Sequence, residues 1–146
     1  MPSCFEPHEA SGPRLLVLLT PISDFRRAGG KLITWHGTAD QLIPFNGTAD
    51  YYNCVRADDP VLDDYYRFFT APGVGHCYGG SGSYPGSGLD TFIEWVERGI
   101  APESLYAETV NVDGEGRARA ANLCQYPLVL TYIGGDVAEA SSYDCK

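Results

Sequence analysis

Two short apolar runs with a helical stretch between them constrain the fold of this chain more than any other feature. Residues 31–35 read Lys-Leu-Ile-Thr-Trp and residues 65–69 read Tyr-Tyr-Arg-Phe-Phe, and both are typical of strands buried in a sheet. A helix between two consecutive strands returns the chain so that the strands pair in parallel. The pattern therefore predicts an α/β fold with at least two parallel strands.

The same pattern predicts that the sheet is incomplete within this chain. Parallel sheets are covered on both faces, and two strands alone cannot form one. The length of 146 residues suits a single domain. Residues 1–22 read as an irregular, proline-containing leader, and we expect residues 23–146 to form the back end of a larger α/β domain.

Local signals predict three helices around these strands. Their expected N-caps are Ser23, then Asn46 or Thr48, then Ser87 or Asp90. Asp50 would lie in the first turn of the second helix, where an acidic side chain suits the helix dipole. Residues 79–88 are too rich in glycine for a regular element and form either the wall of a cleft or a flexible surface connection. Residues 105–112 and 128–133 are strand-like.

The charge of the chain limits its partners. The formal net charge is −9, with 19 acidic and 10 basic side chains. Nucleic acids and anionic membranes are bound by basic faces, and no apolar run approaches the roughly 20 residues that span a bilayer. We therefore expect neither a nucleic acid nor a membrane as partner.

Five cysteines give an odd number, so at least one of them has no partner within the chain. No Cys-x-x-Cys pair is present, which argues against a zinc site. Cys124 and Cys145 flank the last segment and are expected to form a local disulfide. Asn46 begins an Asn-Gly-Thr sequon, expected in a surface turn. Cysteines and sequon together favour a secreted parent protein, although the N-terminal residues do not resemble a signal peptide.

Two polar side chains follow the two predicted strands. Asp40 comes after the first strand, and His76 lies on a glycine-rich turn after the second. Adjacent parallel strands bring such loops together at their carboxyl ends. Acid before histidine is also the order found in the α/β-hydrolases, where the acid orients the histidine that activates a serine. A turn-forming aspartate and a hydrogen-bonded loop histidine are the alternatives.

The other candidates for a nucleophile or a base are weaker. His36 ends the first strand, where a backbone carbonyl can satisfy its ring, so we expect it to be structural. Cys77 adjoins His76 directly and is poorly placed to act with it as a nucleophile. A Gly-x-Ser-x-Gly elbow requires glycine both two residues before and two residues after the serine, and none of Ser81, Ser83 and Ser87 has both. The sequence therefore contains no recognisable nucleophile elbow to act with His76 and Asp40.

These motifs resemble the tannase/feruloyl esterase family of fungi and bacteria. The resemblance is carried by residues 31–37 with Asp40, and by residues 71–77, which read Ala-Pro-Gly-Val-Gly-His-Cys. A tryptophan-containing helix over residues 92–99 and the Cys-Gln-Tyr-Pro of residues 124–127 extend it. The similarity covers most of the chain but only the C-terminal part of a full-length member.

The resemblance implies specific roles. Asp40 matches the acid of a Ser–His–Asp triad and His76 its base, and Cys77 matches one half of a disulfide whose other cysteine precedes the serine. That Cys-Ser pair is absent, as is the lid domain that carries substrate contacts and a structural calcium site in family members. The expected fold is the C-terminal portion of an α/β-hydrolase, without a cofactor of its own. Cys4 and Cys54 are not family positions, and their pairing stays open.

The function implied is that of a secreted serine esterase acting on phenolic esters such as galloyl or feruloyl esters. This chain by itself is expected to be inactive, because it contains no nucleophile. The alternative from a different class is a disulfide-stapled, secreted binding module without catalysis, and a degenerate gene product is a third.

Overall fold

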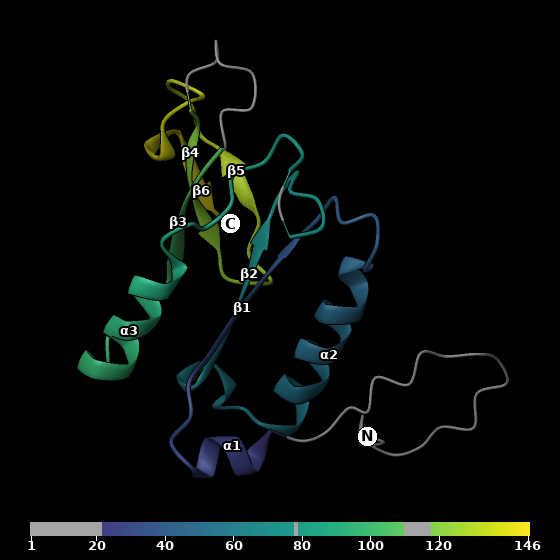
Figure 1. Ribbon diagram of the computed structural model, residues 1–146, viewed down its shortest axis with the longest axis vertical. Helices are drawn as coiled ribbons and strands as arrows, with labels where there is room; N and C mark the ends of the chain where they lie inside the picture. The colour runs from purple at the N-terminus through teal and green to yellow at the C-terminus, as the bar shows by residue number, and fades with distance from the viewer. Residues whose placement is uncertain (1–21, 78, 110–117) are drawn as a thin grey trace, which may run out of the picture.

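Parallel pairing of the two predicted strands forms the centre of the computed structural model, which describes residues 22–77, 79–109 and 118–146. β1 (Leu32–Gly37) and β2 (Tyr66–Ala71) pair in parallel along their whole length. α2 (Phe45–Asp58) connects them and lies on one side of the pair, while α3 (Gly88–Arg98) lies on the other (Figure 1). The predicted strand–helix–strand unit is therefore confirmed.

Short elements complete the described chain. A five-residue helix precedes β1, and two antiparallel strand pairs, β3 with β4 and β5 with β6, follow α3 (Figure 1). Their bounds are α1 Ser23–Arg27, β3 Ser104–Glu108, β4 Ala120–Cys124, β5 Leu130–Tyr132 and β6 Tyr143–Cys145, with 3₁₀ turns at Leu62–Asp64 and Ala140–Ser142.

The alternation of side chains along β2 divides the core into two clusters. Phe68 points toward α2 and Phe69 toward the opposite face, because successive residues of a strand face opposite ways. The α2 side contains an aromatic cluster of Tyr52, Tyr66 and Phe68 with the partly buried Tyr126. The opposite side is built from Phe69, Ala71, Val74, Leu105, Ala107 and Leu123.

β1 is less buried than β2. Five of the six residues of β2 are buried, whereas five of the six residues of β1 are only half-buried. In the described part of the chain β2 has neighbours on both sides, since an isolated bridge joins Phe69 to Gln125 just after β4, while β1 pairs only with β2. β1 is therefore an edge strand here.

Some predicted boundaries were wrong. Both strands end two residues later than predicted, at Gly37 and Ala71. α1 begins at Ser23, with Ile22 rather than Ser23 as its N-cap. Ser87 does take the N-cap position of α3, and Gly99 ends that helix in the left-handed conformation (φ 72°).

The start of α2 also differs from the prediction. The helix begins at Phe45 with Pro44 at its N-cap, so neither Asn46 nor Thr48 caps it and Asp50 lies beyond its first turn. Proline favours this start because its fixed φ suits a helix entrance. Asn46 is consequently exposed on the first helical turn rather than in a surface turn.

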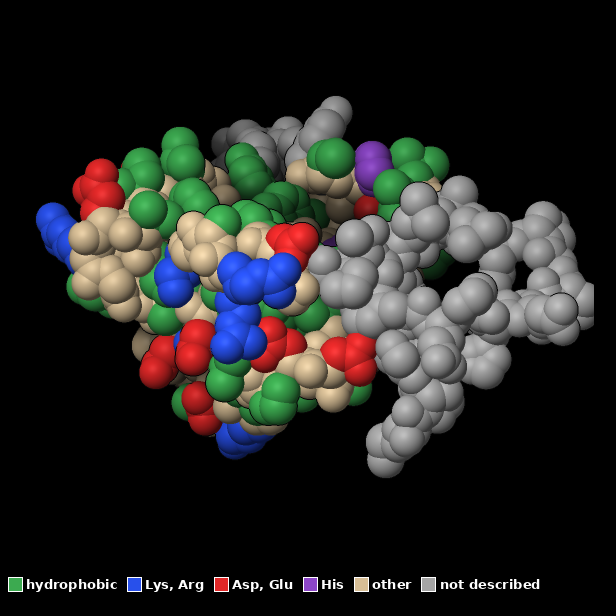
Figure 2. Space-filling view, turned by 90° about the horizontal axis from the view of Figure 1, so that it is seen from below, with side chains coloured by type: hydrophobic (Ala, Val, Ile, Leu, Met, Phe, Trp, Pro, Cys, Tyr) green, Lys and Arg blue, Asp and Glu red, His purple; other side chains and the backbone are tan. Residues whose placement is uncertain are grey.

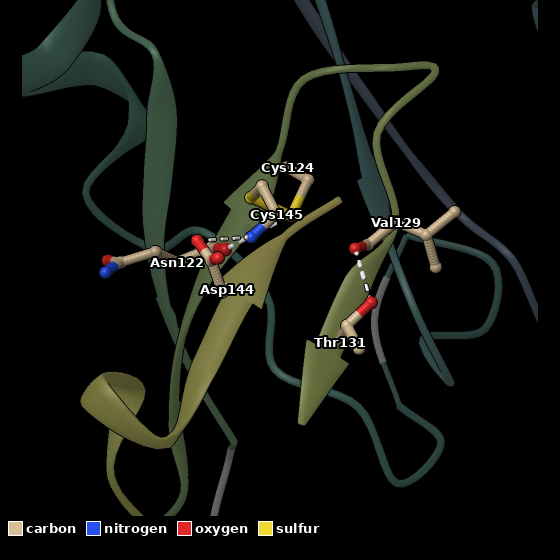
Figure 3. Close-up of a disulfide and its surroundings, with 6 residues drawn as sticks. All are labelled: Asn122, Cys124, Val129, Thr131, Asp144 and Cys145. Atoms are coloured by element: carbon tan, nitrogen blue, oxygen red, sulfur yellow. Dashed lines mark hydrogen bonds between the residues drawn. A yellow bond between two sulfur atoms is a disulfide. The ribbon is translucent and has the colours of Figure 1, made fainter. Parts of the chain in front are cut away.

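The C-terminal segment contains the predicted disulfide. Cys124 and Cys145 are bonded, with their Cα atoms 5.6 Å apart, and they join the end of β4 to the end of β6 (Figure 3). β4 and β6 were not predicted as strands. Residues 110–112 of the predicted strand 105–112 lie outside the described residues. Cys54 is buried and disulfide-bonded, but Cys4 lies outside the described residues, so that pairing stays a prediction.

The Cys124–Cys145 disulfide gives a first testable prediction. Replacing both cysteines by alanine is expected to lower the free energy of unfolding by about 3 kcal/mol, because the bond closes a loop of about 20 residues. Urea denaturation followed by circular dichroism measures this loss. Cys77 is free, so Cys77→Ala is the matched control, and an equal loss in that variant would contradict the assignment.

Candidate functional site

Two loops meet at the carboxyl ends of β1 and β2. The backbone amide of Thr38 donates to the carbonyl of Ala71 at 3.0 Å, and the amide of Ala39 donates to the carbonyl of Val74 at 3.1 Å. These bonds continue the strand pairing beyond the sheet. The loop after β1 is thereby fixed against the loop after β2.

The close approach of the loops requires glycine at the end of β1. A Cβ atom on Gly37 would lie 2.2 Å from the carbonyl oxygen of Val74, so any larger side chain would push the loops apart. The glycine that ends the Trp-His-Gly sequence of β1 is therefore required for steric reasons. Without it, the residues that follow could not reach one another.

Asp40 and His76 meet across this junction. Nδ1 of His76 donates to Oδ2 of Asp40 at 3.0 Å. The Asp40 side chain is only 6% exposed, whereas His76 remains 35% exposed. Because Nδ1 carries the shared proton, Nε2 is left as the ring nitrogen that can accept a proton from another group. The structure therefore brings together the two residues that the sequence analysis singled out.

The second oxygen of Asp40 is held by backbone amides. Oδ1 accepts hydrogen bonds from the amides of Leu42 and Ile43, both at 2.8 Å. The Ile43 amide first, then the Leu42 amide and His76, lower the pKa of Asp40 to about 2, against the opposing effect of burial. The carboxylate is therefore ionised at neutral pH and suited to orient a histidine.

This depressed pKa predicts how stability depends on pH. A carboxyl group whose folded pKa lies below its unfolded value of 3.8 stabilises the fold above that value and loses the effect as the pH falls toward about 2. The stability difference between wild type and Asp40→Asn should therefore be largest well above pH 3.8 and shrink as the pH falls from about 5 toward about 2. Urea midpoints measured across this range provide the test, and a difference that does not change with pH would contradict the prediction.

His36 also contacts Asp40, which the sequence analysis did not predict. Its Nε2 lies 3.1 Å from the carbonyl oxygen of Ile43 and 3.3 Å from Oδ2 of Asp40. Since both neighbours are acceptors, Nε2 carries the proton, and Nδ1 accepts from the Thr48 hydroxyl at 2.8 Å. Both ring nitrogens are therefore engaged, and the Ile43 carbonyl is the kind of backbone partner that was expected for this ring.

The glycine-rich loop folds back over the turn that carries His76. The amide of Gly75 donates to the carbonyl of Gly79 at 3.0 Å, and the amide of Ser81 donates to the carbonyl of Gly73 at 3.1 Å. Between them Cys77 adopts a positive φ of 62° and remains free and exposed. The Ser83 hydroxyl donates to the carbonyl of Arg119 and is thereby engaged at β4.

One surface hollow lies away from the Asp40–His76 pair. A hollow of about 620 Å³ is lined by side chains including Arg56, Arg67 and Tyr126, near the start of β2 rather than at its His76 end. Neither Asp40 nor His76 lines this hollow. Within the described ranges, no cluster of three His, Cys, Asp or Glu residues could hold a metal ion, and no helix is long and apolar enough to cross a membrane.

Comparisons with known proteins agree with the geometry. The family model described as "Tannase and feruloyl esterase" matches residues 18–146. A probable feruloyl esterase of Arthroderma benhamiae is 40% identical over 129 residues, which cover 85% of this chain and 24% of that protein.

Solved structures give the same result. A crystal structure of an esterase from Aspergillus oryzae superposes with a TM-score of 0.78 and 32% identity, covering 86% of this chain and 29% of that one. The tannin acyl hydrolase from Aspergillus niger has a TM-score of 0.71 and 30% identity, with coverage of 86% and 24%. The chain thus spans about a quarter of the length of the proteins it matches.

Proposed function

Because this chain belongs to the tannase and feruloyl esterase family, we propose that it carries the acid and the base of a serine carboxylic ester hydrolase. The fold is the C-terminal portion of an α/β-hydrolase, and the serine is supplied by polypeptide outside this chain. The observation that carries the proposal is the 3.0 Å hydrogen bond from His76 to the nearly buried Asp40. A binding module has no need of such an aligned pair.

In this mechanism His76 transfers a proton and Asp40 keeps the ring in position. Nε2 of His76 removes the proton of the incoming serine hydroxyl as the oxygen attacks the ester carbonyl, and it later protonates the leaving alcohol. Nδ1 remains bonded to Asp40, whose negative charge stabilises the imidazolium that forms. The amides of Leu42 and Ile43 prevent the carboxylate from rotating away.

Cys77 is the proposed link to the serine. Its thiol is free and exposed next to His76, which is where a cysteine beside the nucleophile would have to bond to hold serine and histidine together. The positive φ of Cys77 turns the chain sharply between the histidine and the glycine-rich loop. A disulfide from Cys77 to the part that carries the serine would therefore fix the distance between the serine hydroxyl and Nε2 of His76, on which proton transfer depends.

The proposed substrates are phenolic esters, and the proposed location of the parent protein is extracellular. The names of the relatives indicate feruloyl and tannin esters. The Cys124–Cys145 disulfide and the exposed Asn46 sequon suit an oxidising, glycosylating secretory route. The substrate class and the extracellular location are proposed for the whole protein rather than for this chain alone.

Two proteins test the proposal: residues 1–146 alone and a chimeric esterase that contains them. Residues 1–146 alone should not hydrolyse methyl ferulate or methyl gallate. The Aspergillus oryzae esterase in which this chain replaces the matching part, which we call the completed enzyme, should hydrolyse at least one of them. Turnover by residues 1–146 alone that His76→Ala abolishes would refute the external nucleophile. A folded completed enzyme without activity on either ester would refute the esterase assignment.

A further inference from the structure

The ring of His36 is held from two sides by the first turns of α2. The Thr48 hydroxyl donates to its Nδ1 at 2.8 Å, and an edge-to-face contact places the ring centre 5.8 Å from that of Phe45. The Phe45 ring in turn stacks on Phe68 of β2. Because only 11% of the His36 side chain is exposed, its orientation is determined by the packing around it.

The other ring nitrogen of His36 engages the loop that presents Asp40. Nε2 donates to the carbonyl of Ile43 at 3.1 Å and lies 3.3 Å from Oδ2 of Asp40. The amide of the same Ile43 donates to Oδ1 of Asp40 at 2.8 Å and contributes most to the lowering of the Asp40 pKa. His36 thus holds Ile43 by its carbonyl, and Ile43 holds the carboxylate by its amide.

Asp40 depends on these contacts because no permanent cation is paired with it. Within the part of the chain that the structure describes, its ion-pair contacts are with His36 and His76 and not with a lysine or an arginine. Figure 2 shows histidine at the upper right of the face it views, apart from the Lys and Arg side chains at the centre and left. A nearly enclosed carboxylate without such a cation is kept in one orientation by the hydrogen-bond donors around it.

We propose that His36 is a positioning residue of the esterase site, which keeps Asp40 in the orientation that aligns His76 with the serine. The catalytic consequence rests on the proposed function, whereas the hold on Asp40 does not. Without Nε2–H of His36, the Ile43 carbonyl would lose its donor and the loop after β1 would relax. Oδ2 of Asp40 would then turn away from Nδ1 of His76, and the imidazole would be misaligned for proton transfer.

Kinetics of the completed enzyme on methyl ferulate and methyl gallate test this role. His36→Leu removes both ring nitrogens and should lower kcat by about 10- to 100-fold. KM should change little, because His36 contacts Asp40 rather than the reacting atoms. His36→Gln keeps an amide donor near the position of Nε2, so it should be at least about threefold more active than His36→Leu.

The Thr48 hydroxyl provides a second variant, because it orients the ring of His36. Thr48 also belongs to the sequon of Asn46, so every protein in this comparison carries Asn46→Gln to exclude an effect of a glycan. Thr48→Val should lower kcat by about 3- to 10-fold, and Thr48→Ser should restore it. The matched control is Thr91→Val on α3, whose hydroxyl bonds to the carbonyl of Ser87 and which should keep the full kcat.

The ring protons give a readout that does not require activity. The chain contains three histidines, so ¹⁵N-histidine labelling of residues 1–146 gives few ring signals to assign by NMR. The proton that His76 shares with Asp40 should be observable in the wild type. It should exchange with water at least about tenfold faster in His36→Leu, because the carboxylate that holds it is no longer fixed.

Several results overturn the proposal. A folded His36→Leu variant with unchanged kcat and unchanged exchange at His76 would leave His36 with a structural role alone, even if its urea midpoint fell. Equal losses in Thr48→Val and Thr91→Val, or a Thr48→Ser variant that restores nothing, would also contradict it. If His36→Leu does not fold, His36→Gln and Thr48→Val are compared with the wild type in the same two measurements.

Failure of this inference and failure of the esterase assignment are distinguishable. If the completed enzyme hydrolyses neither ester, the esterase assignment fails, and exchange of the His76 ring proton alone decides whether His36 holds Asp40. If the completed enzyme is active and neither kcat nor exchange responds to His36→Leu, the esterase stands and the positioning role falls.

Discussion

Replacing His76 by alanine in the completed enzyme should lower kcat on phenolic esters by on the order of 10⁵- to 10⁶-fold. In the proposed mechanism the imidazole accepts the serine proton, and removal of such a base from a serine hydrolase disables the nucleophile almost completely. Steady-state kinetics with methyl ferulate measure the loss. KM should change little, because His76 acts on the reacting atoms rather than on the remainder of the substrate.

The control for this experiment lies on α3. Glu94 forms an exposed ion pair with Arg98, so Glu94→Gln should leave kcat unchanged. If His76→Ala retained more than a few per cent of activity while remaining folded, His76 would not be the base. Equal losses in both variants would instead indicate a general defect of the chimeric protein.

Replacing Phe68 by alanine should destabilise residues 1–146 by about 3–5 kcal/mol. The side chain is fully buried, and its ring centre lies 5.9, 5.5 and 5.3 Å from those of Phe45, Tyr52 and Tyr126. Because single domains are stable by only about 5–15 kcal/mol, this variant should be largely unfolded in mild denaturant. Urea denaturation followed by circular dichroism measures the effect.

An exposed aromatic residue on a strand is the matched control for Phe68→Ala. Tyr106 lies on β3 and is 47% exposed, so Tyr106→Ala should cost less than about 1 kcal/mol. A similar cost for both variants would mean that the aromatic cluster between α2 and the sheet does not hold the fold together. The ratio between the two losses is therefore the informative quantity.

The Asp40–His76 pair was predictable because it depends on short-range rules. Two buried runs with a helix between them fix parallel pairing, and parallel pairing places the residues after each strand in adjacent loops. This is sufficient to bring Asp40 near His76. The contact of His36 with Asp40 was not predictable, because it depends on how the loop over residues 41–44 folds back on β1.

The elements that were not predicted from the sequence depend on contacts with other parts of the fold. β4 and β6 are short, and they are defined by pairing with β3 and β5 rather than by a pattern of their own. The start of α2 at Phe45 was missed because Thr48, a good capping residue, bonds to the ring of His36 instead. The apolar spacing predicted α3 correctly, but it contained no information about which side of the helix would be covered.

The steric fit of Gly37 against Val74 has a consequence for the timing of activity. All the contacts that join Asp40 to His76 lie within one continuous stretch of chain, from β1 to the turn after β2. Acid and base can therefore come into position as soon as this stretch folds, whether or not the nucleophile has reached them. In the proposed esterase the pair would be formed in advance, and the moment at which activity begins would be set by the docking of this part against the serine rather than by a rearrangement of Asp40 and His76.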